Sequence, residues 1–315
     1  MRQETFEGLK TTFPMALTIE KEKGAESRVS TNETFQKIVI LGYGKVTGEV
    51  LQYVYDRKKE YGYEMEFIEH EIHSFSITEK ICAERGIPFH RITDKKELTA
   101  SLDRITDKTL IVSASNNFLF PASLVEKAHI TIVNFHNALL PDYPGRNAPT
   151  WAIYRGEKTT GITWHYVTAG VDEGSIIIQK QCEITDDMKA YELTEKLMDL
   201  AAEAFRECFG RILEESVQAR EQGFDPGRRM YRSREVPADG HFSLTDQPEA
   251  IYCLLRSVDY GKNDLFPLVR TRIDGREAEI TRYRRIPTDR RKEGEGLLYL
   301  PLGADSLLKL KYRFL

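Results

Sequence analysis

Short apolar runs alternate with amphipathic stretches over the first part of the chain. The run at residues 37–41 stops at Gly42 and is typical of a buried parallel strand. Residues 46–61 follow with apolar positions on one helical face. Further strands are predicted at 64–68, 109–112 and 130–135, and further helices at 77–85 and 121–128. This βαβ alternation predicts an α/β fold with a doubly wound, Rossmann-like parallel sheet.

The pattern changes after residue 161. Two extended segments, 161–167 and 175–184, flank a turn, and 190–217 is predicted to be one long amphipathic helix. A short helix and several strand-like runs follow: 248–258, then 266–273, 279–283, 296–300 and 307–312. They predict a small second domain that is rich in β-strands.

These changes divide the chain into four predicted parts. Residues 1–36 form an N-terminal extension whose role the sequence does not indicate, with one strand candidate at 15–19. Residues 37–221 form the catalytic α/β domain, and residues 222–238 have the glycine and proline content of a linker. Residues 239–315 form the C-terminal domain.

Composition narrows the class of protein. The chain has 315 residues, 41% of them hydrophobic and 30% charged, as in ordinary globular proteins. Its net charge of −4 gives no overall attraction to nucleic acid or to an anionic membrane. There is no secretory signal and no apolar run near the ~20 residues that span a bilayer. Four scattered cysteines without a CxxC pair favour a reduced, cytoplasmic setting, and a homo-oligomer stays open.

Two common ligand motifs are weak here. Gly42, Gly44 and Gly48 follow a strand and begin a helix, but their spacing is GxGxxxG, so a nicotinamide-dependent oxidoreductase is only a distant alternative. His70 and His73 are the one close histidine pair, and no third metal ligand accompanies them. We therefore expect a tight turn at the glycines and no metal site.

A stronger constellation lies between residues 132 and 179. Asn134 and His136 alternate with apolar residues, so on a strand they share one face at its carboxyl end, where ligands bind in open parallel sheets. Asp172 follows in a turn flanked by Gly170 and Gly174. The sequence thus gathers an amide, an imidazole and a carboxylate.

This stretch resembles the formyltransferases that use 10-formyltetrahydrofolate. That family includes glycinamide ribonucleotide formyltransferase, methionyl-tRNA formyltransferase and the nucleotide-sugar N-formyltransferases. Four separated motifs agree with the family pattern in order and spacing: Asn134-Phe135-His136, the run 139–145 (LLPDYPG), Thr163-Trp164-His165 and Asp172-Glu173-Gly174. The likeness covers about residues 37–217. Ala138 stands where many members have serine, and Ala148 where many have proline.

The resemblance implies the formyltransferase fold, with an open-barrel, OB-like C-terminal domain, and direct transfer of a formyl group from 10-formyltetrahydrofolate to a primary amine. Asn134 and His136 would stabilise the oxyanion, and Asp172 would hold His136 and take the amine proton. The folate would lie against the backbone of two segments: Asn117, Phe118 and Leu119, and Thr168, Ala169 and Gly170. Neither a metal nor a covalent intermediate is required.

The identity of the amine that accepts the formyl group depends on weaker features of the sequence, outside these motifs. A domain that binds tRNA should be strongly basic, yet residues 221–315 hold 18 Lys and Arg against 15 Asp and Glu. One basic cluster runs from Arg282 to Lys292, and its role is open. The charge balance favours a small amine, an amino sugar that is nucleotide-linked or a biosynthetic intermediate. Methionyl-tRNA is the alternative, so nucleic acid is disfavoured without being ruled out.

Overall fold

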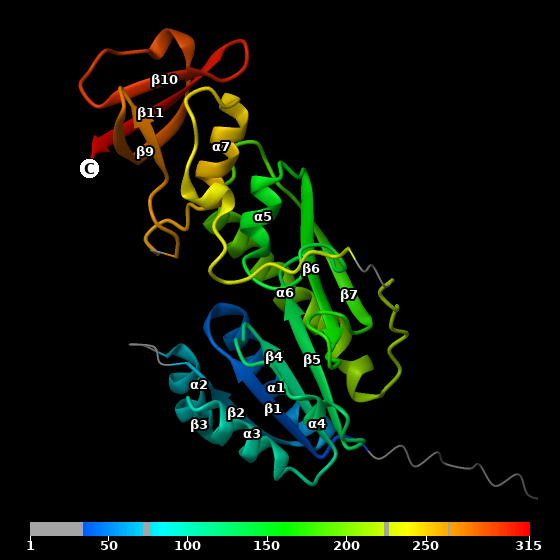
Figure 1. Cartoon of the computed structure of the whole chain (residues 1–315). Coiled ribbons are helices and arrows are strands. Elements are labelled where there is room, and N and C mark those ends of the chain that lie inside the picture. Colours follow the sequence, from blue (N-terminus) through cyan, green and yellow to red (C-terminus); the bar gives the residue numbers. More distant parts are fainter. Residues whose placement is uncertain (1–33, 72–75, 224–226, 264) are drawn as a thin grey trace, which may run out of the picture. The chain divides into compact units, whose positions relative to one another are not determined.

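A seven-stranded sheet in the order β3-β2-β1-β4-β5-β6-β7 forms the core of the molecule. Figure 1 shows this sheet in the computed structural model, which describes residues 34–71, 76–223, 227–263 and 265–315. The first five strands in that order are parallel, while β6 is antiparallel to both of its neighbours. The strands are β1 (Lys37–Gly42), β2 (Glu64–Glu69), β3 (Phe89–Arg91), β4 (Thr109–Ala114), β5 (Ile130–His136), β6 (Thr159–Tyr166) and β7 (Ile176–Glu183).

Helices cover both faces of this sheet. The helices are α1 (Gly44–Tyr61), α2 (Ile77–Arg85), α3 (Lys95–Asp103), α4 (Ala122–Val125), α5 (Ala148–Tyr154), α6 (Ala190–Leu213) and α7 (Pro248–Ser257). Ile38 and Ile40 of β1 pack with α1 and α6, whereas Val39 and Leu41 pack with α3 and α4. Burial on both faces explains why β1 is a continuous apolar run.

The glycine-rich turn after β1 is a close-packing device. A Cβ on Gly42 would lie 1.7 Å from the backbone oxygen of Ala114 on β4. The same oxygen accepts a hydrogen bond from the Thr47 hydroxyl at the start of α1. Only glycine allows β1 and β4 to approach in this way, which accounts for Gly42 without a dinucleotide.

The doubly wound architecture is confirmed, with the antiparallel pair β6 and β7 added at one edge of the sheet. Every predicted helix and strand among the described residues is present, although three are clearly shorter than predicted. α4 does not fill 121–128, α6 ends before residue 217, and β8 covers only 270–273 of the predicted 266–273. The strand candidate at 15–19 lies outside the described residues. Three elements were not predicted: β3, α3 and α5. β3 has only three residues, and α3 buries only Leu98 and Leu102, so neither gives a clear period.

A second sheet confirms the β-rich C-terminal region. Its four antiparallel strands have the order β10-β11-β9-β8, one fewer than the five of an OB fold. They are β8 (Arg270–Ile273), β9 (Arg276–Pro287), β10 (Leu297–Pro301) and β11 (Ser306–Phe314), with short 3₁₀ turns at η1 (Pro237–Gly240) and η2 (Thr288–Arg290). α7 packs against α5 and contributes Ile251, Leu254 and Leu255 to the core of this region.

Residues 34–315 form one compact unit. Within the described part of the chain, no helix has both the length and the apolar content to cross a bilayer.

Candidate active site

A cavity of about 460 Å³ lies beyond the carboxyl ends of β4 and β5. The turn between β6 and β7 forms another part of its wall. All nine residues predicted for catalysis and folate binding line this one cavity: Asn117, Phe118, Leu119, Asn134, His136, Thr168, Ala169, Gly170 and Asp172. Segments that are far apart in the sequence therefore meet at the edge of the sheet where ligands are expected.

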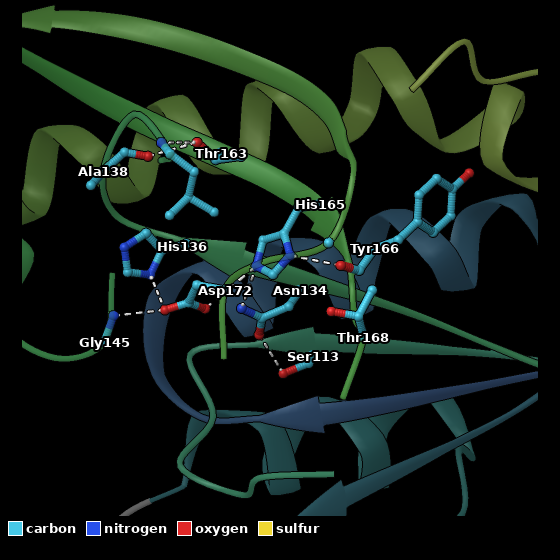
Figure 2. Close-up of polar contacts among 12 residues, drawn as sticks. Ser113, Asn134, His136, Ala138, Gly145, Thr163, His165, Tyr166, Thr168 and Asp172 are labelled. Carbon is cyan, nitrogen blue, oxygen red and sulfur yellow. Dashed lines mark hydrogen bonds and ion pairs between the residues drawn. The ribbon is translucent and has the colours of Figure 1, made fainter. Parts of the chain in front are cut away.

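Asn134 is held on both sides by neighbouring strands. The Ser113 hydroxyl on β4 donates to Asn134 Oδ1 at 2.7 Å, which fixes the amide oxygen. The amide nitrogen then lies 3.2 Å from Nε2 of His165, the residue opposite Asn134 on β6 (Figure 2). Because Nδ2 carries two hydrogens, one can bind His165 while the other remains to serve a ligand.

His136 is buried, with 5% of its surface exposed. Its Nε2–H donates to the backbone oxygen of Tyr143 at 2.8 Å, and its Nδ1 lies 3.5 Å from Oδ2 of Asp172. Burial lowers the pKa of His136 below its ordinary value, and this effect outweighs the opposing influence of the Asp172 carboxylate. The resting imidazole is therefore neutral near pH 7, with its unprotonated Nδ1 toward Asp172.

Asp172 lies between two histidines and a backbone donor. Its Oδ2 accepts the Gly145 N–H at 2.7 Å, and its Oδ1 lies 3.6 Å from Nε2 of His165. Burial opposes ionisation, but His136, His165 and the Gly145 N–H together hold the pKa of Asp172 well below its usual range. The backbone of Asp172 has a φ of 56°, the left-handed conformation that aspartate tolerates better than most residues.

His165 is part of the site, although sequence reasoning gave it no role. Its Nδ1–H donates to the backbone oxygen of Tyr166 at 2.8 Å, so Nε2 is the acceptor that faces Asn134. Only 2% of its surface is exposed. The Thr163-Trp164-His165 motif could have pointed to this residue. The motif does not reveal the register between β5 and β6, which places His165 opposite Asn134.

Thr163 fixes the loop that follows β5. Its hydroxyl donates to the Ala138 backbone oxygen at 2.7 Å and accepts the Leu140 N–H at 3.1 Å. Figure 2 shows these contacts above the catalytic cluster. Since the loop uses the backbone of Ala138, which is fully buried, the methyl group in place of serine is compatible with this arrangement.

The two segments predicted to hold folate differ in how their backbone is engaged. The Asn116 side chain binds both the N–H and the carbonyl of Phe118, at 2.9 and 3.2 Å. Phe118 is itself buried, whereas Leu119 is 71% exposed. The residues on either side of Phe118 are thus better placed than Phe118 to offer backbone groups to a ligand. On the other segment, the Thr168 hydroxyl contacts the Gly170 carbonyl at 3.5 Å.

No group of three or more metal-ligating side chains occurs among the residues that the structure describes. His70 of the predicted histidine pair bonds the Ile92 carbonyl through Nδ1, and His73 lies outside the described residues.

The fold and the cavity define a formyltransferase-type α/β protein. A family model described as formyl transferase matches residues 30–208, more than half of the chain, and the chain belongs to this family.

Among curated proteins, a methionyl-tRNA formyltransferase of Acetivibrio thermocellus is 40% identical over 109 residues. That match covers 35% of this chain and 35% of the relative, and a second such enzyme matches over 36% of its own length. The chain thus spans about a third of the length of these relatives.

Solved structures resemble the chain over a longer span. An N-formyltransferase of Helicobacter canadensis, in complex with folinic acid and dTDP-3-aminofucose, has a TM-score of 0.67 at 14% identity and covers 88% of this chain and 99% of its own. A sugar 3N-formyl transferase solved with dTDP and 5-N-formyl-THF has the same TM-score at 16% identity, covering 88% and 98%. At such identities these matches establish the shared fold.

Proposed function

We propose that this protein is an N-formyltransferase that moves a formyl group from 10-formyltetrahydrofolate to a primary amine of a small substrate. The observation that carries this proposal is the meeting of Asn134, His136 and Asp172 in one cavity with both folate-binding candidates. Membership of the formyl transferase family supports the same chemistry. The folate derivatives named for two similar structures support the donor.

The amine nitrogen would attack the formyl carbon, and the carbonyl oxygen would become an oxyanion. Asn134 Nδ2 would donate to that oxyanion. The amine proton would pass to the ionised Asp172 and on to His136 Nδ1, 3.5 Å away. The imidazolium formed in this way would be stabilised by the carboxylate and would place a positive charge near the oxyanion. Cleavage of the bond from carbon to the folate nitrogen, with return of a proton to that nitrogen, would release tetrahydrofolate and the formamide.

This order of steps changes the role of His136 in one respect. The family resemblance implies that His136 stabilises the oxyanion. Because burial lowers the pKa of His136, the structure favours an imidazole that gains its charge during the reaction. Asn134, whose oxygen is fixed by Ser113, is then the donor present from the start.

We favour an amino sugar as the acceptor. The net charge of −4 gives no general attraction for a polyanion, and a similar structure was solved with dTDP-3-aminofucose. Thr194, Met198 and Tyr260 also line the cavity and carry no ionised side chain, so an uncharged sugar ring could lie against them. Asp172 is the carboxylate that an amine bound in this cavity would meet.

Methionyl-tRNA is the second candidate, and one face of the C-terminal sheet favours it. Arg282 lies directly opposite Lys311, and Arg284 opposite Lys309, on the face away from the core. Such like-charge pairs destabilise a sheet unless an anion neutralises them. Tyr299 lies beside Lys309 in the register and adds an aromatic ring that could stack on a base. Arg285, by contrast, lies 3.6 Å from Asp187.

A substrate panel separates the two candidates. We would measure tetrahydrofolate release from 10-formyltetrahydrofolate with amino-sugar nucleotides and with methionyl-tRNA, using the wild type and a Lys309→Gln/Lys311→Gln variant. The small-acceptor proposal predicts turnover with an amino sugar that the double substitution leaves unchanged. Preference for methionyl-tRNA, with a KM for tRNA that rises in the variant, would reverse our ranking.

A further inference from the structure

Arg228 joins two loops that carry the proposed catalytic residues. Its Nε donates to the Pro141 carbonyl at 2.9 Å, in the loop that follows His136. Its Nη2 donates to the Asp172 carbonyl at 3.0 Å, in the turn between β6 and β7. The fixed fork of a guanidinium can bridge two acceptors in this way, while a lysine ammonium has no such geometry.

Gln222, at the start of the linker, binds the same turn. Its Nε2 donates to the carbonyls of Asp172 and Gly174, at 2.9 and 2.6 Å. Only the NH₂ end of an amide can donate to two carbonyls, so the orientation of this side chain is determined. The Asp172 carbonyl therefore accepts two side-chain donors, from residues 50 and 56 positions further along the chain.

The linker segment 227–236 is also tied to the catalytic loop through its backbone. Tyr231 N–H donates to the Pro144 carbonyl at 3.0 Å, and Arg146 N–H donates to the Tyr231 carbonyl at 2.9 Å. A Cβ on Gly145 would lie 2.3 Å from that Tyr231 oxygen, so the backbone of the linker packs directly against the backbone of the loop at Gly145. Gly145 in turn donates its N–H to the Asp172 carboxylate.

We propose that Arg228 and Gln222 are positioning residues that hold the Asp172 turn at its working distance from His136. The expected effect of these residues on the reaction rate rests on the proposed formyl transfer. The carboxylate is oriented at its oxygen atoms by Gly145 and at its backbone by the two linker side chains. The Asp172 backbone is left-handed, a conformation that needs such outside support. Without the bridge the turn relaxes, and the 3.5 Å separation from His136 Nδ1 is no longer enforced.

Arg228 also acts on His136 through its charge. The groups that influence this imidazole are its burial, Asp172, the Tyr143 carbonyl, His165 and Arg228. Burial, His165 and Arg228 lower its pKa, whereas Asp172 and Tyr143 raise it. Loss of the charge alone would raise this pKa, whereas withdrawal of Asp172 removes a larger influence that raises it. A variant that keeps the charge but loses the bridge should therefore shift the His136 titration downward.

The test compares Arg228→Met and Arg228→Lys with Arg234→Met, an exposed arginine of the same linker segment. We expect Arg228→Met to lower kcat by about 10- to 100-fold, because an ångström of misplacement costs about that much, with little change in KM for folate. Arg228→Lys should lose rate and shift the His136 titration downward, because it keeps the charge but not the two-acceptor bridge, and Arg234→Met should match the wild type. An unchanged kcat in both Arg228 variants would overturn the inference.

Two further measurements test the inference if no formyl-transfer rate can be measured or if Arg228→Met does not fold. NMR titration of His136, assigned with a His136→Gln variant, should show a lower pKa in Arg228→Lys than in the wild type, even if the wild type transfers no formyl group. Should Arg228→Met fail to fold, Gln222→Glu supplies the second variant, because it directs a carboxylate at two carbonyls, with Gln222→Met as its uncharged partner. We expect a larger loss of kcat in Gln222→Glu than in Gln222→Met, and equal rates would contradict the proposed role.

Discussion

At the scale of single residues, each proposed catalytic group owes its orientation to a second group that does not react. Ser113 fixes the oxygen of Asn134, the Tyr143 carbonyl fixes the tautomer of His136, and the Gly145 N–H fixes one oxygen of Asp172. These partners come from a neighbouring strand or from the following loop. The site is preorganised in the sense that its donors and acceptors are directed before any ligand binds.

Acid should destabilise the protein through this cluster. The folded-state pKa of His136 lies below its ordinary 6.5, so protons bind the unfolded chain preferentially as the pH falls through that value. The pKa of Asp172 is also lowered, so its contribution is present above about 3.8 and is lost as the pH falls further. Urea unfolding between pH 8 and 4 should therefore show stability falling below about 6.5, by at most ~1.4 kcal/mol per pH unit from His136.

The matched variant for that measurement is His136→Gln, which keeps a polar side chain but cannot titrate. Its stability should stay flatter between pH 7 and 5 than that of the wild type. If both proteins lose stability with the same slope in this range, His136 is not a buried neutral imidazole.

At the scale of elements, the apolar pattern predicted the parallel strands and the long helices, because burial on both faces leaves a continuous signal. It missed β3 and α3, which bury few side chains, and α5, a helix of only seven residues that is buried on all sides and so shows no amphipathic period. Only residues 279–283 of β9 were predicted, because the arginines in the rest of the strand interrupt its apolar alternation. The turn before it is visible in the sequence: Asp274 and Gly275 have the positive φ angles expected in the turn of a β8–β9 hairpin.

The turn after β1 gives a prediction at this scale. Gly42→Ala places a Cβ against the Ala114 oxygen and should lower the free energy of unfolding by about 2–4 kcal/mol. Gly44→Ala is the control, because Gly44 also has a positive φ of 78° but a Cβ added there would meet no heavy atom within 4 Å. It should cost only the backbone strain, about 1 kcal/mol. Equal losses in denaturant unfolding would contradict the close-packing account.

At the scale of the whole molecule, the motifs located Asn134, His136 and Asp172 but not the groups that orient them. The contacts of Arg228 and Gln222 join backbone carbonyls to side chains 48 or more residues away, and no periodicity or spacing encodes such bonds. His165 was visible as part of a motif, yet its place opposite Asn134 required the β5–β6 register. The domain boundaries at 221 and 239 remain predictions.

The central claim is folate-dependent formyl transfer by the Asn134, His136 and Asp172 cluster. The most direct measurement follows tetrahydrofolate and formylated amine together, using 10-formyltetrahydrofolate, the best amino-sugar acceptor of the panel, and the wild type beside Asp172→Asn. We predict equal amounts of the two products with the wild type, and a rate about 10²- to 10⁴-fold lower in Asp172→Asn with folate binding retained. Wild-type turnover by Asp172→Asn, or no folate-dependent formylation of any amine by the wild type, would contradict the account.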